Sequence, residues 1–201
     1  FTAQWVINDY TITFDYGNGT NTSTDFTYTE TIIYPNLLRE GYTFVYWEPK
    51  PERMPAEDTT VTAQWTVNNY TLTLDYGNET VANETLDFNT TINYPEDVMK
   101  RGYTFNYWEP MPERMPAHDF TTVAQLSPNN YTVFFDTNGG DPLSEVDKAK
   151  EVTFDSPYGV LPTVSRTGYT FLGWFMGSTK LNKKIEDSTV VKTSNDHTLY
   201  A

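Results

Sequence analysis

The sequence repeats itself, and this constrains its fold more than any other feature. Three similar segments begin at tyrosines that lie 60 and 61 residues apart, Tyr10, Tyr70 and Tyr131. Residues 41–64 and 102–125 are identical at 18 of 24 positions. Identity of that extent does not arise by chance, so we interpret the chain as three tandem copies of one unit, with the third more diverged.

The register of the copies predicts where each one begins and ends. The expected repeats are 6–66, 67–127 and 128–201. Residues 1–5 read FTAQW and match VTAQW at 61–65, so we expect them to be the tail strand of a preceding repeat. The final residues TLYA match the start of the same closing strand, which predicts that the last strand of the third repeat is truncated.

Hydrophobic residues alternate with polar ones along the start of each repeat. Tyr10, Ile12 and Phe14 are separated by threonines. A period of two with threonines and aromatic residues favours half-buried strands. The predicted strands are 10–16, 26–34, 42–47 and 60–65 in the first repeat, 70–76, 86–94 and 103–108 in the second, and 131–135 and 169–175 in the third. Short segments at 36–40 and 96–101 are expected to form single helical turns.

The composition excludes several classes of function. The chain has no cysteine, two histidines and a net charge of −14. It therefore cannot use disulfides, thiol catalysis or cysteine-bound zinc. Nucleic acids and anionic membranes are recognised by clustered Lys and Arg, which argues against both partners. No apolar run is long enough to span a bilayer, so direct membrane insertion is not expected.

The order of the motifs resembles a known family. The third repeat reads FDTNGG at 135–140, GYTFLGW at 168–174 and TLYA at 198–201. This is similar to the internalin B-repeat family, also called the Listeria–Bacteroides repeat, whose pattern is FDxNGG, GYTFxGW and TLYAxW. The resemblance implies an α+β, mostly β fold. Small β-grasp (ubiquitin-like) domains of about four strands with a short helix would be arranged as beads in an elongated array. Members occur in large secreted or surface-anchored proteins.

Each repeat holds one tryptophan that is the largest candidate for its core, Trp47, Trp108 and Trp174. Trp65 closes the first repeat and Leu126 replaces it in the second, and either residue could complete its own core or cap the neighbouring repeat. Val61 aligns with Thr122 and Thr62 with Val123. The last strand of the second repeat is therefore expected either to turn Val123 outward or to carry a bulge.

Oxygen-rich segments are the first candidates for chemistry. The run Asp136–Asp141 has the composition of a calcium loop but lacks the later ligands, so we interpret it as a hairpin turn.

Carboxylates beside the proline-rich loops could act as an acid–base pair, but are interpreted as a solvated surface: Glu48, Glu52, Glu57, Asp58, Glu109, Glu113 and Asp119. Arg53 and Arg114 are expected to pair with these carboxylates. His118 and His197 have no histidine or cysteine companion and are expected at the surface.

Asn-X-Ser/Thr sequons are more frequent than composition predicts. They are candidate sites of N-glycosylation in a eukaryotic source and a by-product of Asn/Thr-rich strands in a bacterial one. The sequons are Asn18, Asn21, Asn69, Asn78, Asn83, Asn89 and Asn130.

No residue pattern predicts catalysis, and no cofactor or metal is expected. The primary hypothesis is a non-catalytic spacer or stalk in a large extracellular or cell-surface protein. The partners of each repeat would then be the neighbouring repeats of the same chain.

One alternative is adhesion to a host protein or glycan, with the exposed aromatics Tyr46, Tyr107 and Phe120 forming a stripe. A second alternative is self-association through sheet edges into a surface filament. The third repeat, with Lys180, Lys183 and Lys184 in a loop, is the least acidic and the best candidate for a dedicated partner.

Overall fold

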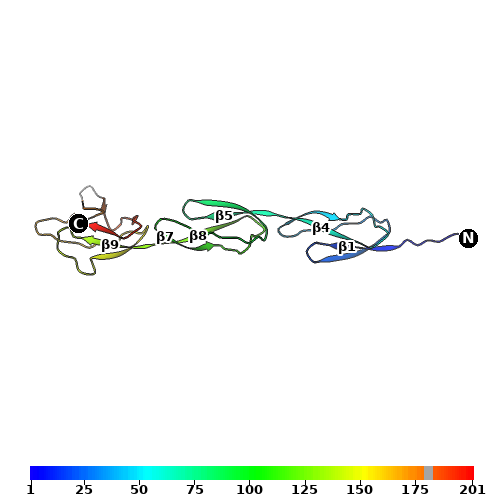
Figure 1. Cartoon of the computed structure of the whole chain (residues 1–201), viewed down its shortest axis with the longest axis horizontal. Coiled ribbons are helices and arrows are strands. Elements are labelled where there is room, and N and C mark those ends of the chain that lie inside the picture. Colours follow the sequence, from blue (N-terminus) through cyan, green and yellow to red (C-terminus); the bar gives the residue numbers. More distant parts are fainter. Residues whose placement is uncertain (179–182) are drawn as a thin grey trace. The chain divides into compact units, whose positions relative to one another are not determined.

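The computed structural model describes residues 1–178 and 183–201, and these residues contain three separate β-sheets and no helix (Figure 1). Lys180 therefore lies outside the described residues. The strands of the first sheet are β1 (Asp9–Asp15), β2 (Asn21–Thr27), β3 (Tyr42–Glu48) and β4 (Thr59–Val67). Those of the second are β5 (Asn69–Asp75), β6 (Val81–Asp87), β7 (Tyr103–Glu109) and β8 (Phe120–Pro128). Those of the third are β9 (Asn130–Asp136), β10 (Ala149–Thr153), β11 (Trp174–Phe175), β12 (Lys184–Ile185) and β13 (His197–Tyr200).

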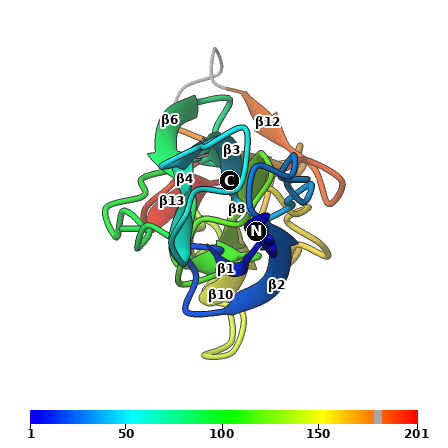
Figure 2. The ribbon, with the colours of Figure 1, turned by 90° about the vertical axis from the view of Figure 1, so that its right-hand side faces the viewer.

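The three sheets share one topology. The first has the order β2-β1-β4-β3, the second β6-β5-β8-β7 and the third β10-β9-β13-β11-β12. In the first sheet β1 pairs antiparallel with β2, as seen side by side in Figure 2, and parallel with β4. The third sheet repeats this, because β9 pairs antiparallel with β10 and parallel with β13. The mostly β prediction is thus confirmed.

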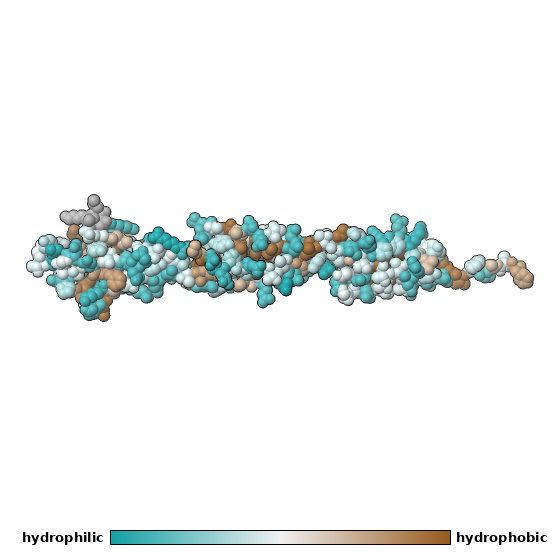
Figure 3. All heavy atoms as spheres, in the orientation of Figure 1, coloured by the Kyte–Doolittle hydropathy of each residue, from teal (hydrophilic) through white to brown (hydrophobic). Residues whose placement is uncertain are grey.

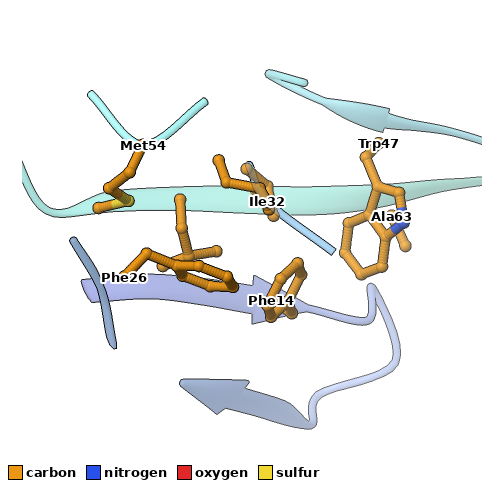
Figure 4. Close-up of a cluster of buried hydrophobic side chains, with 8 residues drawn as sticks. Phe14, Phe26, Ile32, Trp47, Met54 and Ala63 are labelled. Carbon is orange, nitrogen blue, oxygen red and sulfur yellow. The ribbon is translucent and has the colours of Figure 1, made fainter. Parts of the chain in front are cut away.

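The alternating pattern of β1 places its apolar side chains in a core. Ile12 and Phe14 are buried, whereas Thr11 and Thr13, which alternate with them, are half-buried. Figure 4 shows Phe14, Phe26 and Met54 in this cluster, whose full set is Ile12, Phe14, Phe26, Ile32, Trp47, Met54, Val61 and Ala63. Alternation along a strand therefore defines the inner face of the first sheet.

The three central tryptophans are 3%, 3% and 2% exposed at Trp47, Trp108 and Trp174. The indole N–H groups of the last two donate to the carbonyls of Pro95 and Pro162, both at 2.7 Å. Burial of an aromatic side chain contributes about 2–3 kcal/mol, which is a large share of the stability of so small a unit.

The second strand of each of the first two repeats was predicted too late in the sequence. It was expected at 26–34 and 86–94, but β2 and β6 end at Thr27 and Asp87. The turn after β1 is tight, so the chain resumes pairing at once, with Asn21 opposite Asp15. The side chains of Asn21–Asp25 are exposed, and a polar edge strand of this kind carries no hydrophobic alternation.

The expected helical turns at 36–40 and 96–101 do not form, so the α+β part of the predicted fold class is wrong and the structure does not support a β-grasp unit. Segments of five or six residues cannot offset the cost of nucleating a helix by themselves. Here Leu37 packs against the first core instead, and Arg39 forms an isolated bridge with Tyr42.

The third repeat departs from the first two in its central strand. A strand was expected over 169–175, but only Trp174–Phe175 pair. The core of this repeat still forms around Trp174, with Val133, Val152, Tyr158, Ile185, Val191 and Leu199 among its buried members.

Thr122 occupies the buried position that Val61 holds in the first repeat. Strands β4 and β8 have the same burial pattern over their first seven residues, so Val123 takes the half-buried place of Thr62. The shift in pairing lies in β7 between Phe105 and Tyr107, and β3 has the same shift. The second repeat thus keeps its register and buries a hydroxyl that has no hydrogen-bond partner among the described residues.

The chain forms two compact units. One comprises Phe1–Thr73, Ala82–Asn93 and Met111–Thr121, and the other Leu74–Val81, Tyr94–Pro110 and Thr122–Ala201. Their division passes through the second repeat, so the domain boundaries expected from the sequence stay predictions.

Candidate functional site

The junction between the first two sheets lies inside the first compact unit and is built on Gly41. The φ of Gly41 is +74°, and a Cβ added there would stand 2.1 Å from the ring of Phe88. The aromatic ring therefore lies directly on the bare Cα of this glycine. Tyr42 packs against the same ring, with centroids 5.9 Å apart and planes at 81°. Such edge-to-face pairs contribute about 0.5–1.5 kcal/mol beyond the area that they bury.

Asn68 joins the two sides of this junction. Its backbone N–H donates to the carbonyl of Gly41 at 2.9 Å, and its side-chain oxygen accepts from the hydroxyl of Thr43 at 2.6 Å. Its own carbonyl accepts from the N–H of Phe88 at 2.8 Å. One residue between β4 and β5 thus binds the sheet before it and the aromatic residue after it.

The second junction repeats the first with equivalent residues and lies inside the second compact unit. Gly102 has a φ of +79°, and a Cβ there would be 2.5 Å from the ring of Phe154. Tyr103 packs against Phe154 with centroids 5.7 Å apart and planes at 78°. Asn129 donates to the carbonyl of Gly102 at 2.8 Å and accepts from Thr104 at 2.6 Å and from the N–H of Phe154 at 2.9 Å.

Polar groups reinforce the second junction. The hydroxyl of Tyr103 donates to a carboxylate oxygen of Asp155 at 2.7 Å, and Lys192 forms an ion pair with the same carboxylate. The hydrogen bonds from Lys192 and Tyr103 lower the pKa of Asp155, and the bond to Asp155 raises the pKa of Tyr103. Arg101 also donates to the hydroxyl of Ser194 at 3.0 Å.

The arrangement binds one sheet to the next. These junction residues were not predicted from the sequence, although the three repeats share a pattern that marks them. An Asn stands before each repeat at Asn8, Asn68 and Asn129, an aromatic residue at Tyr28, Phe88 and Phe154, and a Gly-Tyr pair at 41, 102 and 168, all in the same register. Tyr28 and Phe88 fall inside the strands predicted at 26–34 and 86–94, and no role was predicted for Asn8, Asn68 or Asn129.

Two of the acidic residues beside the proline-rich loops have a structural role. Asp58 accepts the backbone N–H of Thr11, and Asp119 accepts that of Thr71, both at 2.8 Å. Asp196 does the same for Thr132 in the third repeat at 2.7 Å. A carboxylate therefore satisfies one backbone N–H in the first strand of each sheet.

The predicted pairing of Arg53 and Arg114 with these carboxylates is wrong, because neither arginine forms an ion pair with them in the described part of the chain. Arg53 donates to the carbonyl of Thr29 at 3.0 Å, and Arg114 to that of Asn89 at 2.9 Å. Thr29 and Asn89 both have positive φ. The arginines thus bind the carbonyls of two strained turns, where a guanidinium gains a fixed partner.

The run Asp136–Asp141 forms a turn. The backbone N–H of Asn138 donates to Asp136 at 2.8 Å, and that of Gly140 to the carbonyl of Thr137 at 2.9 Å. The described part of the chain contains no cluster of three acidic or histidine side chains suited to a metal ion.

One histidine differs from its expected place at the surface. His118 is exposed, but His197 is half-buried and its Nε2 lies 2.7 Å from the hydroxyl of Tyr158. Tyr158 is buried in the third core, and burial raises its pKa. His197 therefore completes a polar contact at the edge of that core.

The sequon asparagines stay candidates for glycosylation, and their surroundings differ. Asn18, Asn21, Asn69, Asn83, Asn89 and Asn130 are exposed, whereas Asn78 is half-buried. The side-chain amides of Asn78 and Asn130 donate to Met99 and Glu151, both at 3.1 Å.

The chain matches the Listeria-Bacteroides repeat domain three times, over residues 10–68, 70–127 and 131–201. It belongs to this family. Internalin H of Listeria monocytogenes is 30% identical over 64% of the chain. Two proteins of Evansella cellulosilytica, provisionally named a Gly-rich membrane protein and a membrane protein, are 30% and 31% identical over 99% and 86% of the chain. The family assignment made from the three motifs is thereby confirmed.

The chain spans only part of each of these relatives, namely 27% of internalin H and 26% and 29% of the two Evansella proteins. Among the described residues of this Listeria-Bacteroides repeat chain there is no helix of the length and apolar character needed to cross a membrane.

Proposed function

We propose that this segment is a non-catalytic spacer in a larger surface protein, in which the repeats hold one another in fixed register. The observation that carries the proposal is the recurrence of one junction. Gly41 with Phe88 and Gly102 with Phe154 are equivalent pairs. A spacer transmits position only if its joints resist bending, and the recurrence of the same contacts at both joints supports this role.

The relatives support a place at the cell surface. Two carry the word membrane in their names and the third is an internalin. The net charge of −14 supports a solvated segment, because charged side chains are strongly hydrated. A stalk that projects another domain is consistent with a place at the cell surface and with a solvated segment.

Small-angle X-ray scattering tests the spacer role. We expect one narrow distribution of dimensions for the wild-type chain, and a broader distribution for F88A and F154A, because each removes the ring that seats one repeat on the next. Tyr28→Ala is the matched control, since Tyr28 is the equivalent aromatic of the first repeat and is 44% exposed. Equal distributions for all four proteins would contradict a spacer with fixed joints.

Adhesion is a second candidate function, and the observation that favours it is a pair of exposed aromatic residues. Tyr46 and Tyr107 occupy equivalent positions beside the shift in pairing of β3 and β7, and about half of each residue is exposed. Rings repeated at fixed spacing gain avidity on a repetitive surface such as a glycan. Phe120, the third member of the predicted stripe, is half-buried and contributes less.

A glycan and host-protein binding screen tests this candidate. Binding should be much tighter for the whole chain than for one repeat, and should be lost in a Y46S/Y107S double variant. Adhesion through these rings would be excluded if neither the single repeat nor the whole chain bound any partner in the screen.

Whether the sequon asparagines carry glycans is tested by mass spectrometry of protein from its natural source.

A further inference from the structure

The first and last strands of each of the first two sheets are neighbours, although they lie far apart in the sequence. In the first sheet β1 and β4 hold the two central places of the order β2-β1-β4-β3. In the second sheet β5 and β8 hold the same places. The strands through which the chain enters and leaves these repeats are therefore hydrogen-bonded directly to each other.

The parallel direction of β1 and β4 decides how a stretching force acts on the first repeat. Ile12 pairs with Thr59, and the pairing advances in the same direction along both strands. A pull along the chain acts on Asp9 at the start of β1 and on Val67 at the end of β4. Because these residues lie beyond opposite ends of the paired region, tension slides one strand along the other. The evenly spaced hydrogen bonds of a parallel ladder then carry the load together.

Strands β1 and β2 have the opposite geometry in the same sheet. They pair antiparallel, and Asp9 at the start of β1 lies opposite Thr27 at the end of β2. A pull on these two residues opens the pairs one after another, so each hydrogen bond carries the load alone. Forced unfolding is governed by the unfolding barrier, which is higher when many bonds must break at once.

Two side chains extend the ladder between β1 and β4 beyond its ends. Asp58, which directly precedes β4, accepts the backbone N–H of Thr11 in β1 at 2.8 Å. At the other end, the indole N–H of Trp65 in β4 donates to the carbonyl of Tyr16, which directly follows β1, at 2.8 Å. Sliding of the two strands therefore breaks both side-chain bonds together with the ladder.

Buried side chains protect the inner face of this ladder from water. Ile12 and Phe14 of β1 and Val61 and Ala63 of β4 lie in one cluster, in which Figure 4 shows Phe14 and Ala63. The surface in view in Figure 3 is mostly hydrophilic, as expected when the apolar side chains point inward. Sliding of the strands must therefore also separate packed apolar groups, and water cannot replace the hydrogen bonds from that side.

We propose that the first two repeats carry tension, with the paired first and last strands of each repeat as the load-bearing element. Force that reaches a repeat along the chain passes through these two strands before it reaches any other part of the sheet. This inference goes beyond the spacer role. It does not depend on that role, because it concerns each repeat by itself and holds whether the joints between repeats are rigid or not.

The second repeat has a weaker form of the same element. Leu126 in β8 takes the place of Trp65 and has no N–H to donate. Thr122 in β8 takes the buried place of Val61, and its hydroxyl has no hydrogen-bond partner among the described residues. The second repeat should therefore unfold at a lower force than the first.

Single-molecule force spectroscopy of the whole chain tests the proposal. The chain has no cysteine, so introduced pairs of thiols define where the force acts. D9C/T66C pulls β1 and β4 past each other, whereas D9C/Y28C pulls β1 and β2 apart, and all three positions are exposed. We expect D9C/T66C to withstand at least about twice the force that D9C/Y28C withstands. An equal or lower force for D9C/T66C would overturn the proposal.

Two further variants test the side-chain bonds in this element. W65F removes the indole N–H but keeps an aromatic ring, and D58A removes the acceptor of the Thr11 amide. Each should lower the force in the D9C/T66C direction and leave the D9C/Y28C force unchanged, because only the first direction loads these bonds. D58N keeps an oxygen acceptor and should restore most of the loss. An equal loss in both directions, or none in either, would overturn the assignment of these bonds to the load-bearing element.

The pair D9C/S127C loads the first two repeats in series. Residues 9–67 and 69–128 should unfold in two separate events, each of which releases about 200 Å of fully extended chain. T122V removes the unpaired hydroxyl of the second repeat, so it should raise the force of the weaker event and leave the stronger one unchanged. A change in the stronger event alone would overturn the ranking of the two repeats.

Discussion

Phe88 lies on the Cα of Gly41 so closely that a Cβ at that position would stand 2.1 Å from its ring. The same relationship holds between Phe154 and Gly102 at 2.5 Å. Only glycine permits both the positive φ and the close approach at these positions. The glycines that open the first two GYTF motifs, Gly41 and Gly102, therefore serve the contact with the next repeat as well as the turn in their own.

Alanine at Gly41 or Gly102 should loosen the junction. G41A, G102A and G168A all introduce a side chain at positive φ and share a cost of about 1 kcal/mol. In the first two the methyl group also collides with an aromatic ring, whereas in G168A it meets open space. Hydrogen exchange of the Asn68 and Asn129 amides should accelerate in G41A and G102A respectively and stay unchanged in G168A. Equal exchange in all three variants would show that the ring contact does not hold the junction.

Replacing Thr122 by valine should stabilise the protein. The Thr122 residue is 0% exposed and its hydroxyl has no partner in the described structure, so removal of that group relieves a desolvation cost of about 1–3 kcal/mol. Val61 shows that the equivalent position accepts valine. The control is Thr62→Val, a half-buried site where we expect little change. Urea denaturation measures both variants, and an unchanged or lower midpoint for T122V would refute the assignment.

The aspartates beside the proline-rich loops should matter for stability while their glutamate neighbours do not. D58A removes the acceptor of the Thr11 amide and should cost about 1–3 kcal/mol, as should D119A and D196A. Glu57→Ala changes an exposed side chain next to Asp58 and should be close to neutral. Thermal unfolding provides the comparison. A catalytic or purely solvating role for these carboxylates would instead leave the stability of all four variants alike.

The second junction should weaken at both extremes of pH. The pKa of Asp155 is lowered, so its contribution is complete above the ordinary carboxyl pKa of about 4 and is lost as the pH falls through the lowered value. The pKa of Tyr103 is raised, so its contribution is complete below the ordinary value of about 10 and is lost as the pH rises through the raised one. In the first junction Asn89 stands in the place of Asp155.

An NMR titration of the Asp155 carboxyl checks this dependence. In K192A and Y103F the pKa should move upward toward the ordinary value, because each variant removes one hydrogen bond to the carboxylate. K184A is the control, since Lys184 pairs with Glu186 instead. A pKa that neither K192A nor Y103F changes would contradict the contacts described.

Local patterns in the sequence predicted the part of the fold that depends on alternation. Strands such as β1, β3 and β4 have one face in the core, and hydrophobic periodicity identifies such strands. The start of β2 was predicted too late because Asn21–Asp25 form a polar edge strand. The helical turn at 36–40 was wrong because Leu37 and Arg39 find partners in the first repeat.

The junction could not be predicted from composition or motif chemistry. Its residues are a glycine, an asparagine and an aromatic ring, which are ordinary turn and strand residues taken one at a time. Their role depends on the contact between Gly41 and Phe88, which are 47 positions apart in the sequence. Comparison of equivalent positions across the three repeats, rather than a search for catalytic patterns, would have identified them.

The aromatic–glycine contact is proposed to fix neighbouring repeats to each other. Backbone ¹⁵N relaxation tests it most directly, by comparing the rotational correlation times of the first and second sheets in the wild type and in F88A. We predict one shared correlation time in the wild type and separate, shorter ones in F88A. Independent tumbling of the two sheets in the wild type itself would contradict a junction fixed by the contact between Gly41 and Phe88.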